Sequence, residues 1–210
     1  MDNAREGVKK LFQAQVIELI VAAIAFILLI IVKIPGIPEA VVAAAGVISL
    51  VTIVASLIAF VLQLLGLRIG GEESKLLNLG FWVVVISLVI TLADAIMQLA
   101  RAPKLATDIC EIAVGLCQVL VSYFILAGVA EICLKFGEEK LAKKGKLLAY
   151  IGLALYALGV ILSAVSYFVS TADEVGLAII AILAIVGSLV ELICYVLGFI
   201  FLGVANSTNA

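Results

Sequence analysis

Residues 75–101 read KLLNLGFWVVVISLVITLADAIMQLAR. Most of this stretch is apolar, and its length matches the about 20 residues that a helix needs to cross the hydrocarbon core of a bilayer. Within it, polar side chains recur at intervals of four, three, four and three residues, at Ser87, Thr91, Asp94, Gln98 and Arg101. This spacing places all five on one face of a helix. The stretch therefore predicts a transmembrane helix with one polar face.

The same apolar pattern recurs along the whole chain. Of the 210 residues, 66% are hydrophobic and 13% are charged, whereas a soluble domain is about half apolar and about a quarter charged. Six segments are long and apolar enough to span a membrane: residues 13–33, 39–66, 77–100, 108–134, 147–170 and 176–205. The sequence predicts an all-α integral membrane protein with six transmembrane helices, in a single transmembrane domain over residues 1–210.

Basic residues are distributed unevenly between the two sides of the predicted membrane. Ten of the 13 Lys and Arg precede span 1 or lie between spans 2 and 3 or spans 4 and 5. The other three, Lys33, Arg101 and Lys104, fall in connections on the opposite side. Because basic residues in short loops favour the cytoplasmic side, we expect a multi-pass protein of the cell membrane with both termini in the cytoplasm.

A similar phrase opens each odd-numbered span and suggests an internal repeat. It reads KLFQ at 10–13, KLLN at 75–78 and KLLA at 146–149. We expect three tandem antiparallel hairpins, over residues 8–72, 73–143 and 144–210. Since each hairpin holds two spans, all three have the same orientation and are related by a pseudo-threefold axis along the membrane normal. Chance similarity within a largely aliphatic sequence is the alternative.

Polar residues follow one face in five of the six spans, which indicates a shared polar interior. Span 1 is the exception: Gln15 and Glu18 lie near its cytoplasmic end, and Ala22, Ala25 and Leu29 continue the same face. The candidate residues of this polar seam come from spans 3, 4 and 6, with Arg101 directly after span 3. They are Asp94, Gln98, Arg101, Glu111, Gln118, Glu191 and Tyr195.

The acidic residues of the seam are the most informative about function. Glu191 falls close to the predicted midplane, and no Lys or Arg lies at comparable depth. An unpaired carboxylate there costs several kcal/mol, so we expect Glu191 to be protonated or paired with a cation. Asp94 is expected to connect to Arg101 through Gln98. The seam's hydroxyls and glycines are expected to join neighbouring helices through hydrogen bonds and close packing.

Several kinds of chemistry are excluded by the composition. The chain has no histidine, which removes the usual general base and zinc ligand. Its four cysteines, Cys110, Cys117, Cys133 and Cys194, form no Cys-x-x-Cys pair and are expected to be buried apolar thiols. No glycine-rich phosphate loop is present. We expect no enzymatic activity, no cofactor, no metal site and no nucleic-acid partner.

Two classes of function remain open. One is a transport protein for a small polar or cationic solute, linked to a cation or proton through the acidic seam. The other is a non-transporting structural or interaction protein of the bilayer, such as an oligomeric scaffold, an accessory subunit or a lipid-organising protein. A water-filled cavity reaching Glu191 favours transport, and dry packing around it favours the structural class.

Overall fold

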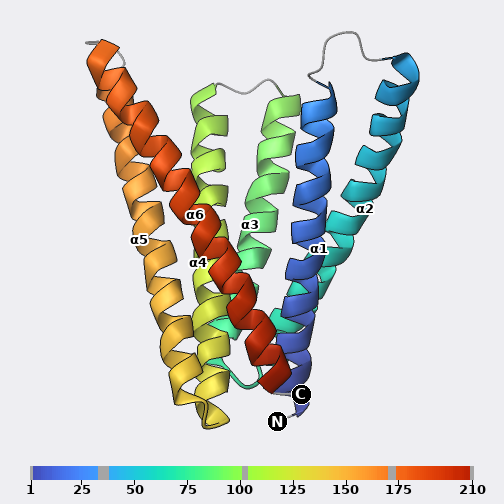
Figure 1. Cartoon of the computed structure of the whole chain (residues 1–210), viewed down its shortest axis with the longest axis vertical. Coiled ribbons are helices and arrows are strands. Elements are labelled where there is room, and N and C mark those ends of the chain that lie inside the picture. The colour runs from blue at the N-terminus through green and yellow to red at the C-terminus, as the bar shows by residue number, and fades with distance from the viewer. Residues whose placement is uncertain (1, 33–37, 101–103, 170–173, 209–210) are drawn as a thin grey trace.

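The computed structural model describes residues 2–32, 38–100, 104–169 and 174–208, with side chains at all of these positions except 32, 39, 42, 104, 105, 108, 111, 159–169, 174–184 and 186–191. The described chain is α-helical apart from short turns (Figure 1). Its six helices are α1 (Asp2–Val32), α2 (Glu39–Gly70), α3 (Lys75–Leu99), α4 (Lys104–Lys135), α5 (Glu139–Val169) and α6 (Glu174–Thr208).

Four stretches of these helices are long and apolar enough to cross a membrane, among the described residues. They are Asp2–Ile31, Ala43–Gly70, Lys75–Leu99 and Ile112–Lys135. The prediction of an all-helical fold is therefore confirmed, and four of the helices have the length and composition of membrane spans. The fifth and sixth predicted spans include many residues whose side chains lie outside the described set, and these two spans stay predictions.

Local sequence signals set the two helical turns on the side of the termini. Ser74 precedes α3, and its hydroxyl oxygen accepts a hydrogen bond from the Leu77 backbone N–H at 3.4 Å. After α4, Gly137 adopts a φ of 85°, a conformation that glycine tolerates best. The Glu138 N–H then donates to the Cys133 carbonyl at 2.9 Å. Ser74 thus begins α3, and Gly137 ends α4.

Each helix packs mainly against its neighbours in the chain, and α6 packs back against α1. The interface between α4 and α5 is much more extensive than those between α2 and α3 or between α6 and α1. A threefold arrangement of hairpins requires these three interfaces to be equivalent. The described contacts therefore show a closed six-helix bundle and do not show threefold symmetry.

The hydrophobic core lies at the end of the bundle where the termini are. Val8, Leu11, Leu67, Leu77 and Leu202 are all at most 1% exposed. The helices converge at this end and diverge toward the other (Figure 1). Large apolar residues in the diverging halves, such as those on α2, are widely exposed in the isolated chain and suit contact with lipid.

Glycines allow the closest helix approach in this core. A Cβ added at Gly7 of α1 would lie 2.6 Å from the backbone nitrogen of Gly70 on α2. A Cβ at Gly66 would lie 2.9 Å from the backbone nitrogen of Leu11. Because these distances leave no space for a methyl group, only glycine permits the observed separation of α1 and α2.

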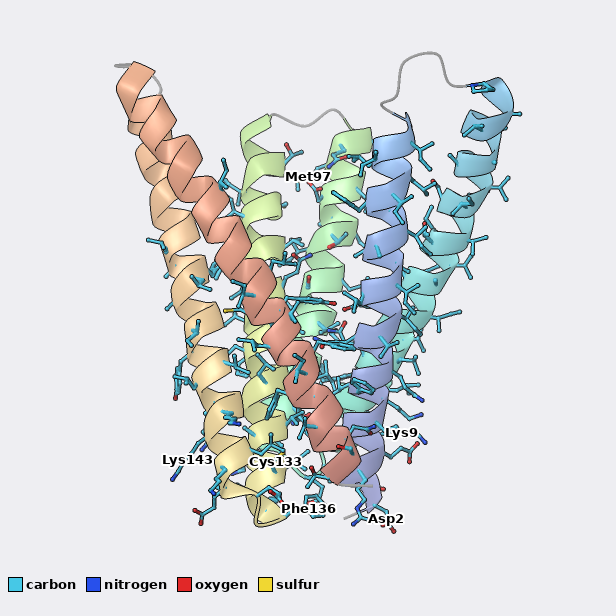
Figure 2. The ribbon with its side chains drawn as sticks, viewed as in Figure 1. Asp2, Lys9, Met97, Cys133, Phe136 and Lys143 are labelled. Carbon is cyan, nitrogen blue, oxygen red and sulfur yellow. The ribbon has the colours of Figure 1, made fainter. Side chains whose placement is uncertain are left out.

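Charged residues surround the converging end, as Asp2, Lys9 and Lys143 illustrate (Figure 2). The Asn3 side-chain amide donates to a Glu72 carboxylate oxygen at 2.6 Å. The Lys135 ammonium donates to the Glu73 carboxylate at 3.3 Å. These contacts connect the N-terminal turn of α1 and the end of α4 to the loop between α2 and α3.

The ion pair between Glu73 and Lys135 predicts a pH dependence of stability. The Lys135 ammonium holds the pKa of the Glu73 carboxyl below its ordinary value. The stability it contributes is therefore present above the pKa of the unfolded chain and is lost as pH falls through the folded pKa. We expect Glu73→Gln to lower the melting temperature at pH 7 and to change it little at pH 2, measured by circular dichroism in detergent. The control variant Glu138→Gln is expected to show no such dependence, and an equal effect of Glu73→Gln at both pH values would contradict the prediction.

Candidate functional site

Two adjoining cavities lie in the middle of the bundle. The smaller has a volume of about 300 Å³ and is lined by residues of α1, α2, α4, α5 and α6. The larger has a volume of about 540 Å³ and is lined by residues of α1 to α4. Glu18, Gln63, Gln118 and Ser122 line both. These four polar residues form the boundary at which the two cavities meet, and we call them the polar junction.

The polar junction lies deep along the helices. Glu18 is near the middle of α1, and Gln118 is near the middle of α4. At a rise of about 1.5 Å per residue, Glu18 lies about 12 Å along the helix from Lys10, the last charged residue before the apolar run. That depth falls within a bilayer whose hydrocarbon core is about 30 Å thick.

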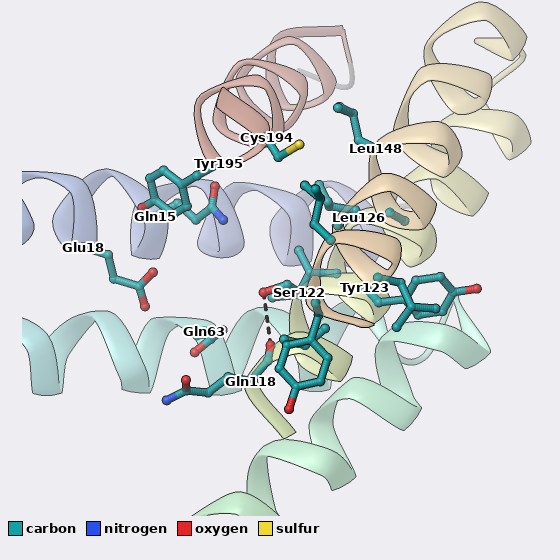
Figure 3. Close-up of a pocket in the computed structure, with 18 residues that line it drawn as sticks. Gln15, Glu18, Gln63, Gln118, Ser122, Tyr123, Leu126, Leu148, Cys194 and Tyr195 are labelled. Atoms are coloured by element: carbon teal, nitrogen blue, oxygen red, sulfur yellow. Dashed lines mark hydrogen bonds between the residues drawn. The ribbon is translucent and has the colours of Figure 1, made fainter. Parts of the chain in front are cut away.

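Among the described residues that line the two cavities, Glu18 is the one with a formal charge. Its side chain extends from α1 into the space that Gln63 and Gln118 also face (Figure 3). No other described residue hydrogen-bonds or ion-pairs with its carboxylate. A charged group at this depth costs free energy without a partner, so binding of a proton or a cation to the carboxylate is favourable.

A second unpartnered acceptor lies one helical turn away. The Gln15 Oε1 atom is buried and has no hydrogen-bond partner among the described residues. Gln15 lines the smaller cavity together with Glu18, and Figure 3 shows it beside Tyr195. Leaving a buried acceptor unpaired costs about 1–3 kcal/mol. The two residues on α1 thus present acceptors that a donor-bearing ligand can satisfy.

The remaining cavity walls are mostly apolar and aromatic. Tyr123, Tyr156 and Tyr195 line the smaller cavity, and Cys194 lies beside them. Leu57 and Phe60 of α2 line the larger one. An apolar wall with a few convergent polar groups is typical of small-molecule binding sites.

The two ends of the bundle differ around these cavities. Toward the termini, the buried core fills the space between the helices, with Leu11, Leu67 and Ile132 at most 1% exposed. Toward the other end the helices diverge (Figure 1), and described side chains such as Leu50 and Leu99 are 65% and 87% exposed. The polar junction therefore lies between the closed end of the bundle, where the termini are, and the end at which the helices diverge.

Two of the seam residues predicted from sequence belong to these cavities. Gln118 is part of the polar junction, and Tyr195 lines the smaller cavity. Ser87 and Thr91, from the polar face of α3 that also carries Asp94, line the larger one. The polar face of α3 thus reaches the cavity with its hydroxyls.

The outer part of that face forms a separate contact. The Gln98 side-chain amide donates to the Asp94 carboxylate at 2.7 Å, in agreement with the expected contact between the two. The second Asp94 oxygen has no hydrogen-bond partner among the described residues, and neither residue lines the two cavities. Arg101 lies outside the described residues, as do the side chains of Glu111 and Glu191.

The expectation that hydroxyls join neighbouring helices is wrong for the described hydroxyls of α2 to α4 whose bonds are resolved. Ser49, Thr52 and Ser56 each donate to a carbonyl of α2 itself, at 2.7–2.9 Å. Thr91 and Ser122 donate within α3 and α4 in the same way. The carbonyl one turn earlier lies on the same face as the hydroxyl, so it is a nearer acceptor than any group on another helix.

The central acid of the site, Glu18, and its neighbour Gln15 were absent from the predicted seam. Both were assigned to the cytoplasmic end of a span beginning at residue 13, but α1 begins at Asp2. The additional turns shift Glu18 to mid-helix. The spacing of Val8 and Leu11, both buried, was the available signal that the helix starts earlier.

The described cysteines differ in their exposure. Cys117 and Cys133 are buried, whereas Cys110 and Cys194 are partly exposed. Within the part of the chain that the structure describes, no group of three or more Cys, Asp or Glu side chains is arranged to hold a metal ion.

Comparison with protein-family models, curated proteins and solved structures finds no match.

Proposed function

We propose that the protein transports a small polar or cationic solute across the membrane and that this transport is linked to a proton or cation bound at Glu18. One observation carries the proposal: an unpartnered carboxylate lines two cavities in the middle of the bundle, and no basic residue is among the described residues of their walls. A structural role does not require a formal charge there, and the charge is costly. A bound proton or cation removes that cost.

The diverging and converging ends fit the same proposal. A solute reaches the polar junction from the end where the helices spread, and the core near the termini closes the other side. Transport then requires the contacts at the closed end to separate, as in alternating access. Among the described residues that line the cavities, Glu18 is the one carboxylate, and the other titratable groups are Tyr123, Tyr156, Cys194 and Tyr195.

We also propose that the protein resides in the cell membrane with both termini in the cytoplasm. The support is the uneven distribution of basic residues, together with the position of both termini at one end of the bundle (Figure 1). The three-hairpin repeat stays a proposal supported by the repeated Lys-Leu phrases.

Proton flux into vesicles tests the transport proposal. Purified protein is reconstituted into liposomes that contain a pH-sensitive dye, and a pH gradient is imposed with the membrane potential clamped. We expect wild-type protein to carry protons and Glu18→Gln to reduce the rate to that of empty liposomes, because glutamine keeps the shape and removes the titrating group. Glu6→Gln is the matched control on the exposed side of α1, and it should retain the wild-type rate.

The alternative function is a non-transporting membrane protein that forms oligomers or organises a partner or lipid. It is favoured when wild-type liposomes carry no more protons than empty ones, or when folded Glu18→Gln carries them at the full rate. Circular dichroism and size-exclusion chromatography of each variant in detergent confirm folding before the flux is compared.

A further inference from the structure

The charge of the cavity walls restricts the ligand class. Among the described residues that line the two cavities, Glu18 carries the one formal charge, and none is Lys or Arg. A deep carboxylate without a counter-charge attracts a cation and repels an anion. A neutral solute can donate a hydrogen bond to the carboxylate but leaves its charge uncompensated. The ligand that best satisfies the site therefore has one positive charge.

The hydrogen-bonding groups restrict the class further. The Glu18 carboxylate has no partner among the described residues, and the buried Gln15 Oε1 atom has none either. Both atoms only accept hydrogen bonds. A primary ammonium group carries three N–H donors and can satisfy both at once, whereas a quaternary ammonium has none.

The volumes exclude a close fit for a bare inorganic ion. Cavities of about 300 and 540 Å³ lie in the range of pockets for organic ligands, about 300–1,000 Å³. Among the described residues, no cluster of three potential metal ligands accompanies Glu18. An organic cation fills this space, and a single metal ion does not.

The remaining walls suit an apolar or aromatic body attached to the ammonium group. Tyr195 lies beside Gln15 in the smaller cavity (Figure 3), and aromatic faces attract cations. Leu57, Phe60 and Leu88 form an apolar wall of the larger cavity. A ligand with its ammonium at Glu18 can place its apolar part against either wall.

We propose that this cavity binds an amphipathic primary amine in its protonated form, with the ammonium group donating to Glu18 and Gln15 and the apolar body against Leu57, Phe60 and the cavity tyrosines. The inference deepens the proposed function by naming the solute, and it rests on that function for its role. The binding itself depends only on the site and is measurable without transport.

Equilibrium binding of a matched ligand series tests the proposal. The probes are 2-phenylethylammonium, trimethyl(2-phenylethyl)ammonium, 2-phenylethanol and 3-phenylpropanoate, measured by isothermal titration calorimetry with full-length protein in detergent and with protein-free micelles as the blank. We expect the primary ammonium to bind at least about tenfold more tightly than the alcohol, since the alcohol has no positive charge and one O–H donor in place of three N–H donors. The quaternary ion should bind more weakly than the primary one, and the anion should not bind.

Variants assign the binding to the site. Glu18→Gln should abolish the preference for ammonium over alcohol. Gln15→Leu should weaken the binding of the primary ammonium and leave the binding of the quaternary ion nearly unchanged. This difference separates the loss of a hydrogen bond from general damage to the protein. Glu6→Gln should bind all four probes as wild type does.

Three outcomes overturn the inference: equal binding of alcohol and ammonium, binding of the anion, or an unchanged ammonium preference in folded Glu18→Gln. The result is independent of the flux experiment. Amine binding without proton flux would support this site and contradict transport, whereas flux without amine binding would support transport and contradict this ligand class.

Discussion

Replacing Leu77 with alanine should lower the free energy of unfolding by about 2–5 kcal/mol, the range for removing a large apolar side chain from a packed core. Leu77 is 0% exposed. Its side chain occupies the space that Cβ atoms would need at Gly70 and Gly128, with side-chain carbons 2.6 Å from each of those positions. Because two backbones border this side chain, the helices cannot readily collapse into the cavity that alanine leaves.

Leu79→Ala is the matched control on the same helix. Leu79 is 50% exposed in the isolated chain, so its truncation removes few protein contacts. Both variants are unfolded in detergent by increasing dodecyl sulfate, with the transition followed by circular dichroism. Similar transitions for the two variants would mean that Leu77 does not occupy the core position described.

Replacing Gly7 with alanine should destabilise the protein by about 1–3 kcal/mol or more, the cost of adding a methyl group to a closely packed interface. The new Cβ atom would lie 2.6 Å from the backbone nitrogen and 2.8 Å from the Cα atom of Gly70. Backbone atoms cannot change rotamer to avoid it, so α1 and α2 must separate.

Gly46→Ala provides the opposite expectation on α2. No atom lies within 4 Å of the position that a Cβ atom would take there. Since alanine favours helix by about 1 kcal/mol over glycine, this variant should be neutral or stabilising. The same dodecyl sulfate transition, measured for both variants, checks the pair. A stable Gly7→Ala protein would exclude the close crossing of α1 and α2.

The number and position of the helices were largely predictable, because about 20 consecutive apolar residues have few alternatives to a transmembrane helix. Helix ends were less predictable. The first predicted span begins at residue 13, where the apolar run starts, yet Val8 and Leu11 belong to the core. Hydropathy measures suitability for lipid, and it cannot identify helical turns that continue beyond the apolar run.

The composition of the site could be predicted only in part. Gln118 and the hydroxyls of α3 were predictable because polar side chains at helical spacing share one face, and that face turns away from lipid. Glu18 was missed because the residues after it, Ala22, Ala25 and Leu29, are apolar, so no polar stripe extends along its face. Contact between helices also has no signature in an apolar sequence, since lipid and protein interior favour the same side chains.

The glycine contact near the termini has a mechanical consequence for the cavity. Gly7 and Glu18 are eleven residues apart on α1, a separation of about 16 Å along the helix axis. Pivoting α1 by about 10° around Gly7 would therefore move Glu18 by about 3 Å, with almost no displacement at the contact itself. A rigid lever of this kind converts a small change in crossing angle into a change in cavity width comparable to the diameter of a water molecule. Gly7 and Gly70 have no side chains, so neither residue needs to change a rotamer as the helix pivots.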